Sequence, residues 1–386
     1  MQNEIKYLSC YTGIIEDNKL YTVNMYLGIL LEYDLKNFSY QVLTRIPLRD
    51  RAQLVRVIKM IKIGSVFYFI FENTRIVWMY DMSSKESDMI ENGEDVADRY
   101  LVNSDAYRWK DCIFLTPERH SETIGVFNWR TNKFDEDIPL GHFSDSSGKV
   151  RITKIGIMDR KIWYTFFGAP VLIGIDVESR GEKHWIIDPS KNILAVSLSE
   201  GYFWILLSGA ELIKWNPEEG IIKKYVLDSL RINEEKPVFR HLYETDTYVY
   251  IVPYYAQCIW KIDKSTEEVF SIKYPSELKR VHPNFERCLF FEVLKDGDNL
   301  FLLPFAVNVL VQLDMNDGRM TYHECSFNRQ EIWKYYCQDI LGKNALSEDE
   351  IIDLSFFVEK IKILNTWNER TNENQKIGIG IMAEVE

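Results

Sequence analysis

Residues 65–90 read Ser-Val-Phe-Tyr-Phe-Ile-Phe-Glu-Asn-Thr-Arg-Ile-Val-Trp-Met-Tyr-Asp-Met-Ser-Ser-Lys-Glu-Ser-Asp-Met-Ile. The two apolar runs in this stretch, 66–71 and 76–80, are rich in aromatic and β-branched residues and are separated by a short polar break. Runs of this composition between polar turns predict β-strands. The pattern recurs about every 47 residues and is found seven times along the chain.

Two landmarks define each repeat. An early pair of apolar residues, six times aliphatic then aromatic and once two aromatics, is followed 12 to 14 residues later by Asp or Asn. The early pairs are Leu20-Tyr21, Val66-Phe67, Ile113-Phe114, Ile162-Trp163, Phe203-Trp204, Val249-Tyr250 and Leu300-Phe301. The late residues are Asp34, Asp81, Asn128, Asp176, Asn216, Asp263 and Asp314, spaced 47, 47, 48, 40, 47 and 51 residues apart. Apolar residues stand one and four positions before each of them, which predicts strands that are buried on both faces.

The late Asp and Asn residues have two interpretations. Each stands where a strand must reverse, and its side-chain oxygen can accept a hydrogen bond from the backbone N–H two residues on. The alternative is a direct role in binding a ligand. Because local turn chemistry explains all seven, we interpret them as turn residues.

A period of about 40–50 residues with four strands in each unit is typical of a β-propeller. The sequence therefore predicts an all-β, seven-bladed β-propeller of four-stranded antiparallel blades over residues 4–325, whose strands we call a to d from the inside outward. For the first blade we expect strands at 5–12, 20–24, 29–34 and 39–43, and for the second blade a first strand at 53–62. Each unit is complete from a to d, so no strand exchange between the termini is expected.

Beyond residue 325 the pattern changes. We expect a helical extension over 326–366, because 330–341 has helical periodicity and Ser347 with Glu350 forms a capping box before a strongly apolar helix. That helix either packs on the propeller or docks a partner. Residues 367–386 are predicted to be an added edge strand or a disordered tail.

Composition bounds the function. A net charge of −12 disfavours a nucleic-acid binder and adsorption to an anionic membrane. The start of the chain lacks the pattern of a signal peptide, so we expect a cytoplasmic protein. The six cysteines are far apart, which predicts neither a disulfide framework nor a metal site, and no cofactor is expected.

The repeat resembles those of kelch and YVTN-type propellers over residues 4–325. The paired glycines of kelch repeats are replaced here, for example by Phe69-Ile70-Phe71, so the resemblance extends to the fold and not to one family. It implies that the b–c and d–a loops share one face around a central channel, where such folds usually bind ligands. It carries over no catalytic residues.

Basic residues concentrate in the predicted d–a connections and at the starts of strand a, although the chain is acidic. Arginines there can bind carboxylates or phosphates through two hydrogen bonds. The candidate ligand-binding residues are Arg51, Arg56, Arg108, Arg151, Arg240, His241, His282 and Tyr254. Arg56 and Arg151 occupy the same repeat position. The alternative is that these residues form salt bridges between blades. Three histidines, His142, His241 and His282, fall near these loops, but nothing in the sequence joins them into a metal site.

Three functions remain open. The favoured hypothesis is a binding or scaffolding protein that holds a peptide, a glycan, a protein partner or an anionic small ligand at the loop face. The second is a lyase or hydrolase with an Arg- and His-lined site at the funnel, in which His or Glu acts as general base. The third is a structural subunit that docks through its C-terminal helices.

Overall fold

The computed structural model describes residues 4–5, 10–24, 28–46, 57–71, 76–91, 103–117, 123–140, 152–199, 201–227, 232, 238–254, 258–274, 278, 289–305, 307, 309–325 and 327–328. The chain divides into two compact units. One comprises Val57–Tyr274, and the other comprises Met1–Arg56 together with Pro275–Glu386.

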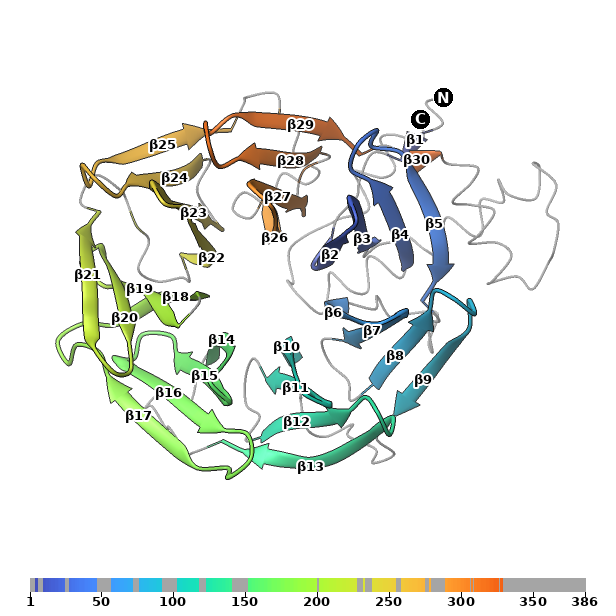
Figure 1. The fold of residues 1–386 in the computed structure, drawn as a ribbon, viewed down its shortest axis with the longest axis horizontal. Coiled ribbons are helices and arrows are strands. Elements are labelled where there is room, and N and C mark those ends of the chain that lie inside the picture. The colour runs from blue at the N-terminus through green and yellow to red at the C-terminus, as the bar shows by residue number, and fades with distance from the viewer. Residues whose placement is uncertain are drawn as a thin grey trace, which may run out of the picture. The chain divides into compact units, whose positions relative to one another are not determined.

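The unit Val57–Tyr274 contains five four-stranded antiparallel sheets, each formed by four consecutive strands (Figure 1). In chain order the strands are β6 (Val57–Ile63), β7 (Val66–Phe71), β8 (Ile76–Asp81), β9 (Ser87–Glu91), β10 (Asn103–Trp109), β11 (Cys112–Pro117), β12 (Thr123–Asn128), β13 (Lys133–Pro139), β14 (Ile152–Met158), β15 (Lys161–Phe166), β16 (Val171–Asp176), β17 (Glu182–Ile186), β18 (Ile193–Ser199), β19 (Tyr202–Leu207), β20 (Glu211–Asn216), β21 (Gly220–Val226), β22 (Phe239–Glu244), β23 (Tyr248–Pro253), β24 (Cys258–Asp263) and β25 (Val269–Lys273). These are blades 2 to 6.

The second unit contains blades 1 and 7 and one short sheet. Its strands are β2 (Gly13–Glu16), β3 (Lys19–Asn24), β4 (Ile29–Asp34), β5 (Tyr40–Arg45), β26 (Phe290–Asp296), β27 (Asn299–Pro304), β28 (Val309–Asp314) and β29 (Met320–Glu324), with β1 (Glu4–Ile5) paired antiparallel to β30 (Phe327–Asn328). Blades 1 and 7 pack on each other: the Cys10 N–H donates to the Pro304 carbonyl at 2.8 Å, and one core contains Leu20 and Leu31 with Leu303 and Leu310.

The predicted seven four-stranded antiparallel blades are confirmed, and each is built from its own four strands without exchange. The early pairs and the apolar positions before the late Asp or Asn are buried throughout, apart from the half-buried Val66. The predicted helical extension lies outside the described residues, except that Phe327–Asn328 is the strand β30. The predicted tail also lies outside them.

The inner strands begin later than predicted. The first strand of blade 1 was expected at 5–12, but β2 starts at Gly13, and β6 starts at Val57 where 53 was expected. The a–b turn fixes the end of each inner strand, and six of the seven extend only six or seven residues back from it. Several residues farther back that were assigned to inner strands, such as 53–56, lie outside the described residues.

The seven late Asp and Asn residues form the predicted turns. In every blade the side-chain oxygen accepts the backbone N–H two residues on, at 2.8–3.1 Å. At Asp176 the Oδ1 atom also accepts the Ser179 N–H at 2.9 Å. This hydrogen bond and those from Arg160 and Glu178 lower the pKa of Asp176 to about 2. The turn interpretation is confirmed.

We expect Asp81→Ala to lower the melting temperature slightly and to leave ligand binding intact, because the lost hydrogen bonds to Ser83 are local to one turn. Thermal unfolding followed by circular dichroism, together with a binding assay, checks this. A variant that melted like the wild type but no longer bound would contradict the turn assignment.

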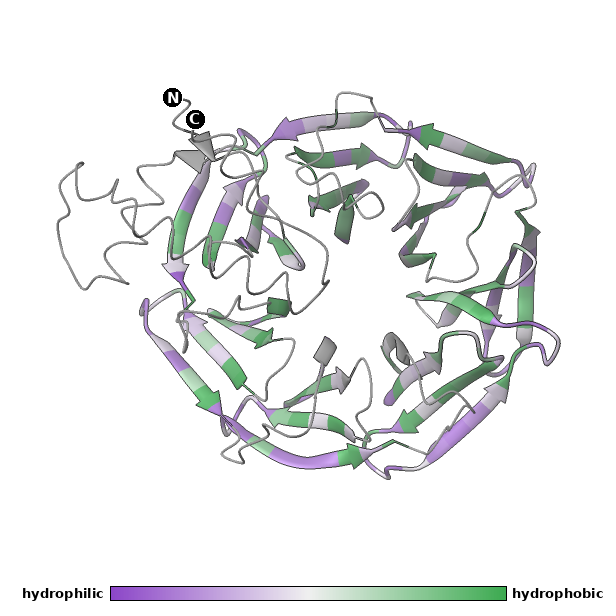
Figure 2. Cartoon of the chain, turned by 180° about the vertical axis from the view of Figure 1, so that it is seen from behind, coloured by the Kyte–Doolittle hydropathy of each residue, from purple (hydrophilic) through white to green (hydrophobic). Residues whose placement is uncertain are grey.

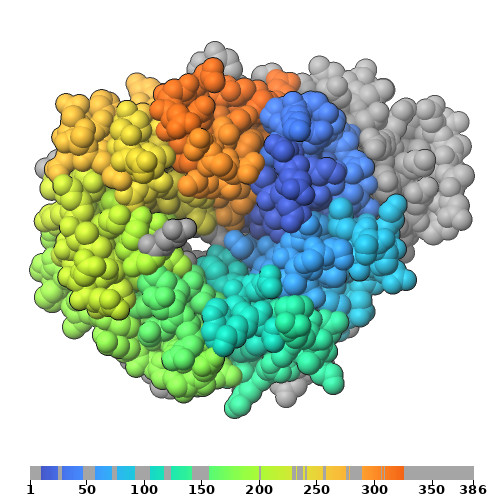
Figure 3. All heavy atoms as spheres, viewed as in Figure 1, coloured from blue at the N-terminus to red at the C-terminus, as the bar shows by residue number. Residues whose placement is uncertain are grey.

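Neighbouring blades in the unit Val57–Tyr274 lie in close contact (Figure 3) and share buried cores. Trp204 of blade 5, for instance, shares a core with Leu242, Val249 and Ile251 of blade 6. Polar residues are concentrated on the outer strands, while the inner layers are apolar (Figure 2). The blades are thus held together mainly by buried aromatic and aliphatic side chains.

An ion cluster also joins blades 5 and 6. The Glu244 carboxylate accepts hydrogen bonds from the Lys264 ammonium at 2.7 Å, from the Lys214 ammonium at 3.1 Å and from the Tyr202 hydroxyl. Burial raises the pKa of Glu244, but these three partners outweigh it and the pKa lies below its usual 4.5. The ionised form is therefore favoured in the folded state.

This arrangement predicts a pH dependence. The stability contributed by Glu244 is fully present above pH 4.5 and is lost as pH falls through the lowered pKa of the folded state. We expect Glu244→Gln to flatten the decline in unfolding free energy over that acidic range. Urea unfolding at a series of pH values checks this, and parallel profiles for wild type and variant would contradict it.

Candidate binding face at the start of the inner strands

The two ends of each blade differ in loop length. Strands a and b are joined by turns of two or three residues, whereas the d–a connections between blades contain six to sixteen residues. Short turns leave little room for variation, and binding residues are usually carried by longer loops on a rigid scaffold. The end where the inner strands begin is therefore the better candidate for a binding face.

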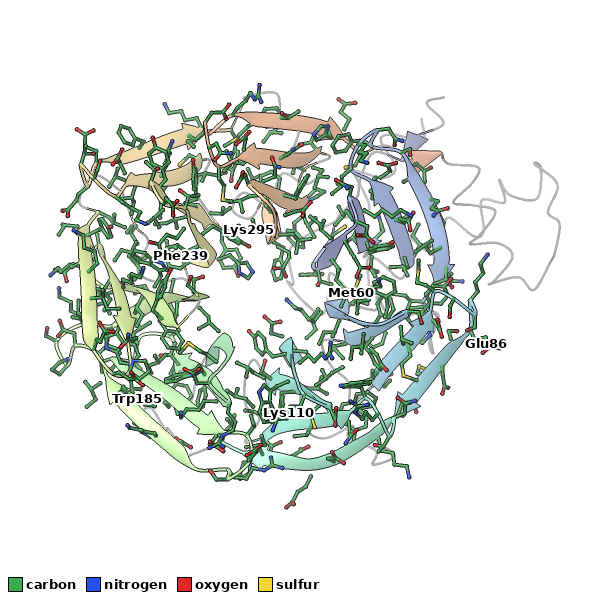
Figure 4. All side chains as sticks on the ribbon, viewed as in Figure 1. Met60, Glu86, Lys110, Trp185, Phe239 and Lys295 are labelled. Carbon is green, nitrogen blue, oxygen red and sulfur yellow. The ribbon has the colours of Figure 1, made fainter. Side chains whose placement is uncertain are left out.

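A β-bulge recurs at that end. In β6, β10, β18, β22 and β26 the register with strand b shifts directly after the first residue of the inner strand. Figure 4 labels Met60 and Phe239 on two of these strands. Bulges redirect the following side chains and are frequent next to functional sites. The residues directly after the bulge, which we call the post-bulge row, are Lys59, Asp105, Ala195 and His241 in the larger unit and Glu292 in the smaller one.

Lys59 and Asp105 form a charge pair on neighbouring inner strands. The Lys59 Nζ lies 3.7 Å from the Asp105 Oδ1, and the Asp105 side chain is only 6% exposed. The Tyr107 hydroxyl donates to the Asp105 Oδ2 at 3.1 Å, and the Ala106 N–H donates to Oδ1 at 2.9 Å. These contacts fix the carboxylate, while the Lys59 side chain stays 24% exposed.

The side-chain contacts also show that neighbouring inner strands run in the same direction. Lys59 and Asp105, which pair, both stand third in their strands. The Ser197 hydroxyl, on the fifth residue of β18, accepts a hydrogen bond from the N–H of Leu242, the fourth residue of β22, at 3.0 Å. The post-bulge residues of the larger unit therefore lie at one end of its blades.

Blade 6 brings three predicted site residues to this end. Arg240 is the bulge residue of β22, His241 follows it, and Tyr254 lies just beyond β23. The Tyr254 N–H donates to the Val238 carbonyl at 3.0 Å, which ties the b–c loop to the start of strand a. The half-buried His241 ring lies 6.1 Å from that of Tyr243. Arg240, His241 and Tyr254 thus stand at the same end of blade 6, and their role in binding a ligand stays a prediction.

The structure does not place the other predicted site residues at this end of the blades. Arg51, Arg56, Arg151 and His282 lie outside the described residues, although Arg56 and Arg151 directly precede β6 and β14 in sequence. The predicted place of Arg108 in a d–a connection is wrong. It is the sixth of seven residues in β10 and pairs with Ile113 beside the two-residue turn, at the opposite end of the blade.

Sequence reasoning missed Lys59 and Asp105. A bulge inserts one residue without a compositional signal, so the position it redirects cannot be read from the repeat spacing. Among the described residues no group of three His, Cys, Asp or Glu side chains is placed to hold a metal ion. Within the same residues, no helix has the length and hydrophobicity needed to cross a bilayer.

No protein-family model matches the chain, and no curated protein matches its sequence. Solved structures do resemble it. A streptogramin B lyase has a TM-score of 0.55 at 10% identity, covering 83% of this chain and 95% of that one. A chain of the mitotic checkpoint complex has 0.51 at 12% identity, covering 83% and 88%. The WD40 repeats of RRP9 have 0.51 at 11% identity, covering 82% and 95%.

These likenesses establish the fold alone. Together with the seven four-stranded sheets, they make the chain a seven-bladed β-propeller. The structures it resembles include both an enzyme and proteins of binding assemblies, so the fold does not choose between the two functions.

Proposed function

We propose that this propeller is a binding protein that holds a peptide, glycan or protein partner, or an anionic small ligand, at the end where its inner strands begin. The observation that carries the proposal is the post-bulge row. Charged or polar residues follow the bulge in three of the four such strands of the larger unit, at the end where the long connections lie.

The chemistry of this end favours an anionic or hydrogen-bonding group. Lys59 presents an ammonium held beside a buried carboxylate, and His241 adds an imidazole in blade 6. Arg240 is included on its position in the sequence. We include Arg51, Arg56, Arg151 and His282 in the proposal on sequence position. A protein of net charge −12 repels polyanions at long range, so a local basic site would favour compact anionic groups over nucleic acid. Cytoplasmic localisation remains part of the proposal.

A second candidate is an enzyme of the lyase or hydrolase type with His241 as general base. Its position directly after a bulge supports this, because bulges often redirect catalytic side chains. We favour binding because the charged residues of the row are spread over several blades, as expected for a surface that grips an extended partner. Turnover of a bound ligand that is abolished in His241→Ala would favour the enzyme.

The test is a melting-shift assay with inorganic phosphate, glucuronate and triglutamate as probes. A ligand at one hundred times its Kd stabilises the folded state by about 2.7 kcal/mol, which is readily measured. We expect at least one probe to stabilise the wild type, and to stabilise Lys59→Ala and His241→Ala less, relative to each variant's own melting temperature. Lys223→Ala, on the outer strand β21, is the control and should respond like the wild type. Equal shifts in all four proteins would contradict the proposal.

A further inference from the structure

A tryptophan flanked by two arginines lies at the opposite end of blade 3, where the short turns are. The Arg108 guanidinium carbon lies 5.4 Å from the centre of the Trp129 ring, and that of Arg130 lies 4.7 Å from it. Both distances are within the range of cation–π attraction. Beside them Lys110, labelled in Figure 4, lies over Trp109 at 4.2 Å. We call Trp129, Arg108 and Arg130 the Trp129 platform.

The indole of this platform is held rigidly. The Trp129 Nε1–H donates to the Lys110 carbonyl at 2.9 Å, and its backbone N–H donates to the Asp111 carbonyl at 3.0 Å. On the other side, the Tyr68 hydroxyl of blade 2 reaches the Trp129 carbonyl at 3.5 Å. A half-buried aromatic ring that is already fixed loses little conformational entropy when a partner covers it.

The other blades do not share this feature. The residue that follows the late Asp or Asn is Leu35, Met82, Val177 or Met315 in blades 1, 2, 4 and 7. In those blades, as in blade 3, the backbone N–H of this residue donates to a carbonyl oxygen of the a–b turn. The backbone is therefore equivalent in these blades, and only the side chain differs. A large aromatic residue is not required by the turn, since four blades close it with a smaller apolar side chain.

The charges of the platform leave one guanidinium available. Arg130 pairs with Asp111 at 2.5 Å, and Lys110 pairs with Glu178 at 2.7 Å. Within the part of the chain that the structure describes, the exposed Arg108 pairs with no carboxylate, and its contact is the face of Trp129. A guanidinium over an aromatic ring can still donate its N–H groups, and two of these match the two oxygens of a carboxylate.

We propose that the Trp129 platform is a second binding surface, which recognises a peptide segment of a protein partner containing a carboxylate next to an aromatic or aliphatic side chain. The carboxylate pairs with the edge of Arg108, and the apolar side chain covers the indole. Trp and Arg are the residues that most often dominate binding energy at protein interfaces. A long polyanion fits less well, because Asp111 and Glu178 flank the platform and repel it.

The test is fluorescence anisotropy of a fluorescein-labelled peptide in which glutamate alternates with phenylalanine. We expect the wild type to bind it more tightly at low salt than at high salt, since exposed charges are screened over about 8 Å at physiological ionic strength. Arg108→Ala should weaken binding at least about tenfold, which corresponds to about 1.4 kcal/mol. Arg108→Lys keeps the charge but not the planar edge and should recover binding only in part.

Lys62→Ala is the matched control. Lys62 is likewise the sixth of seven residues in its inner strand, lies 5.8 Å from the Phe67 ring and should be replaceable without effect on binding. The loss of peptide binding caused by Arg108→Ala should be the same in the Lys59→Ala and His241→Ala backgrounds. The proposal for the Trp129 platform can therefore fail while the loop-face proposal stands, and the loop-face proposal can fail while this one stands. Circular dichroism confirms the fold of each variant, and Arg108 is chosen because its side chain is exposed.

Four results would overturn the inference. The wild type could fail to bind the peptide. It could also bind the peptide with no higher affinity than a matched peptide in which lysine replaces glutamate. Alternatively, Arg108→Ala and Lys62→Ala could weaken binding equally. Finally, a single-stranded oligodeoxynucleotide that bound more tightly than the peptide, with the same loss in Arg108→Ala, would assign the platform to nucleic acid instead.

Discussion

Trp204→Ala is expected to destabilise the protein by about 3–5 kcal/mol, as is usual for removal of a fully buried tryptophan. The side chain is 1% exposed and stands in the core shared by blades 5 and 6, between Leu206 and Leu242 of the two blades. The cavity left by the indole cannot close without moving one blade against the other. Chemical denaturation with linear extrapolation measures the loss.

Two controls separate the cavity from other causes. Trp204→Phe should cost much less, because among the described residues the indole Nε1–H has no hydrogen-bond acceptor and only ring volume is lost. Ile186→Ala, on the outer strand β17, removes a side chain that is 67% exposed and should change stability by less than about 0.5 kcal/mol. If Trp204→Ala unfolded at the same denaturant concentration as the wild type, the assignment of this core would be wrong.

Gly156→Ala is expected to cost about 1–3 kcal/mol, because the residue adopts a backbone conformation that is almost confined to glycine. Its φ angle is +146°, at the irregular position of β14 where the register with β15 shifts. An added Cβ would also lie 2.9 Å from the Leu198 Cδ2 on the neighbouring inner strand. Backbone strain and a steric contact therefore act together.

The two contributions can be separated. Gly201→Ala tests strain alone, because its φ is +75° and nothing lies within 4 Å of the added atom. It should cost roughly 1–2 kcal/mol, the usual cost of a left-handed conformation for an L-residue. In a Leu198→Ala background, Gly156→Ala should retain the strain but lose the contact with the Cδ2 atom. An unchanged stability for Gly156→Ala in the wild-type background would contradict the irregular backbone at β14.

The candidate site was only partly predictable. The positions of Arg240, His241 and Tyr254 along blade 6 could be read from the sequence because the repeat defines the ends of the strands there, while their role in binding stays a prediction. Lys59 and Asp105 were missed because they follow a β-bulge, which redirects their side chains and leaves no signal in the composition. Arg108 was assigned to the wrong end, because in a strand of seven residues an error of a few positions exchanges one end of the blade for the other.

The sequence by itself determined the number of blades, the strand order within each and the seven turns, because these depend on local periodicity and on hydrogen bonds between residues two apart. Only the tertiary structure decided which side chains from different blades meet. The pairing of Lys59 with Asp105 and of Lys214 with Glu244, and the contact of Tyr68 with Trp129, join residues that are 30 to 61 positions apart. Such contacts depend on the register of each strand and on the rotation between sheets, to which every residue of two blades contributes and which no short pattern encodes.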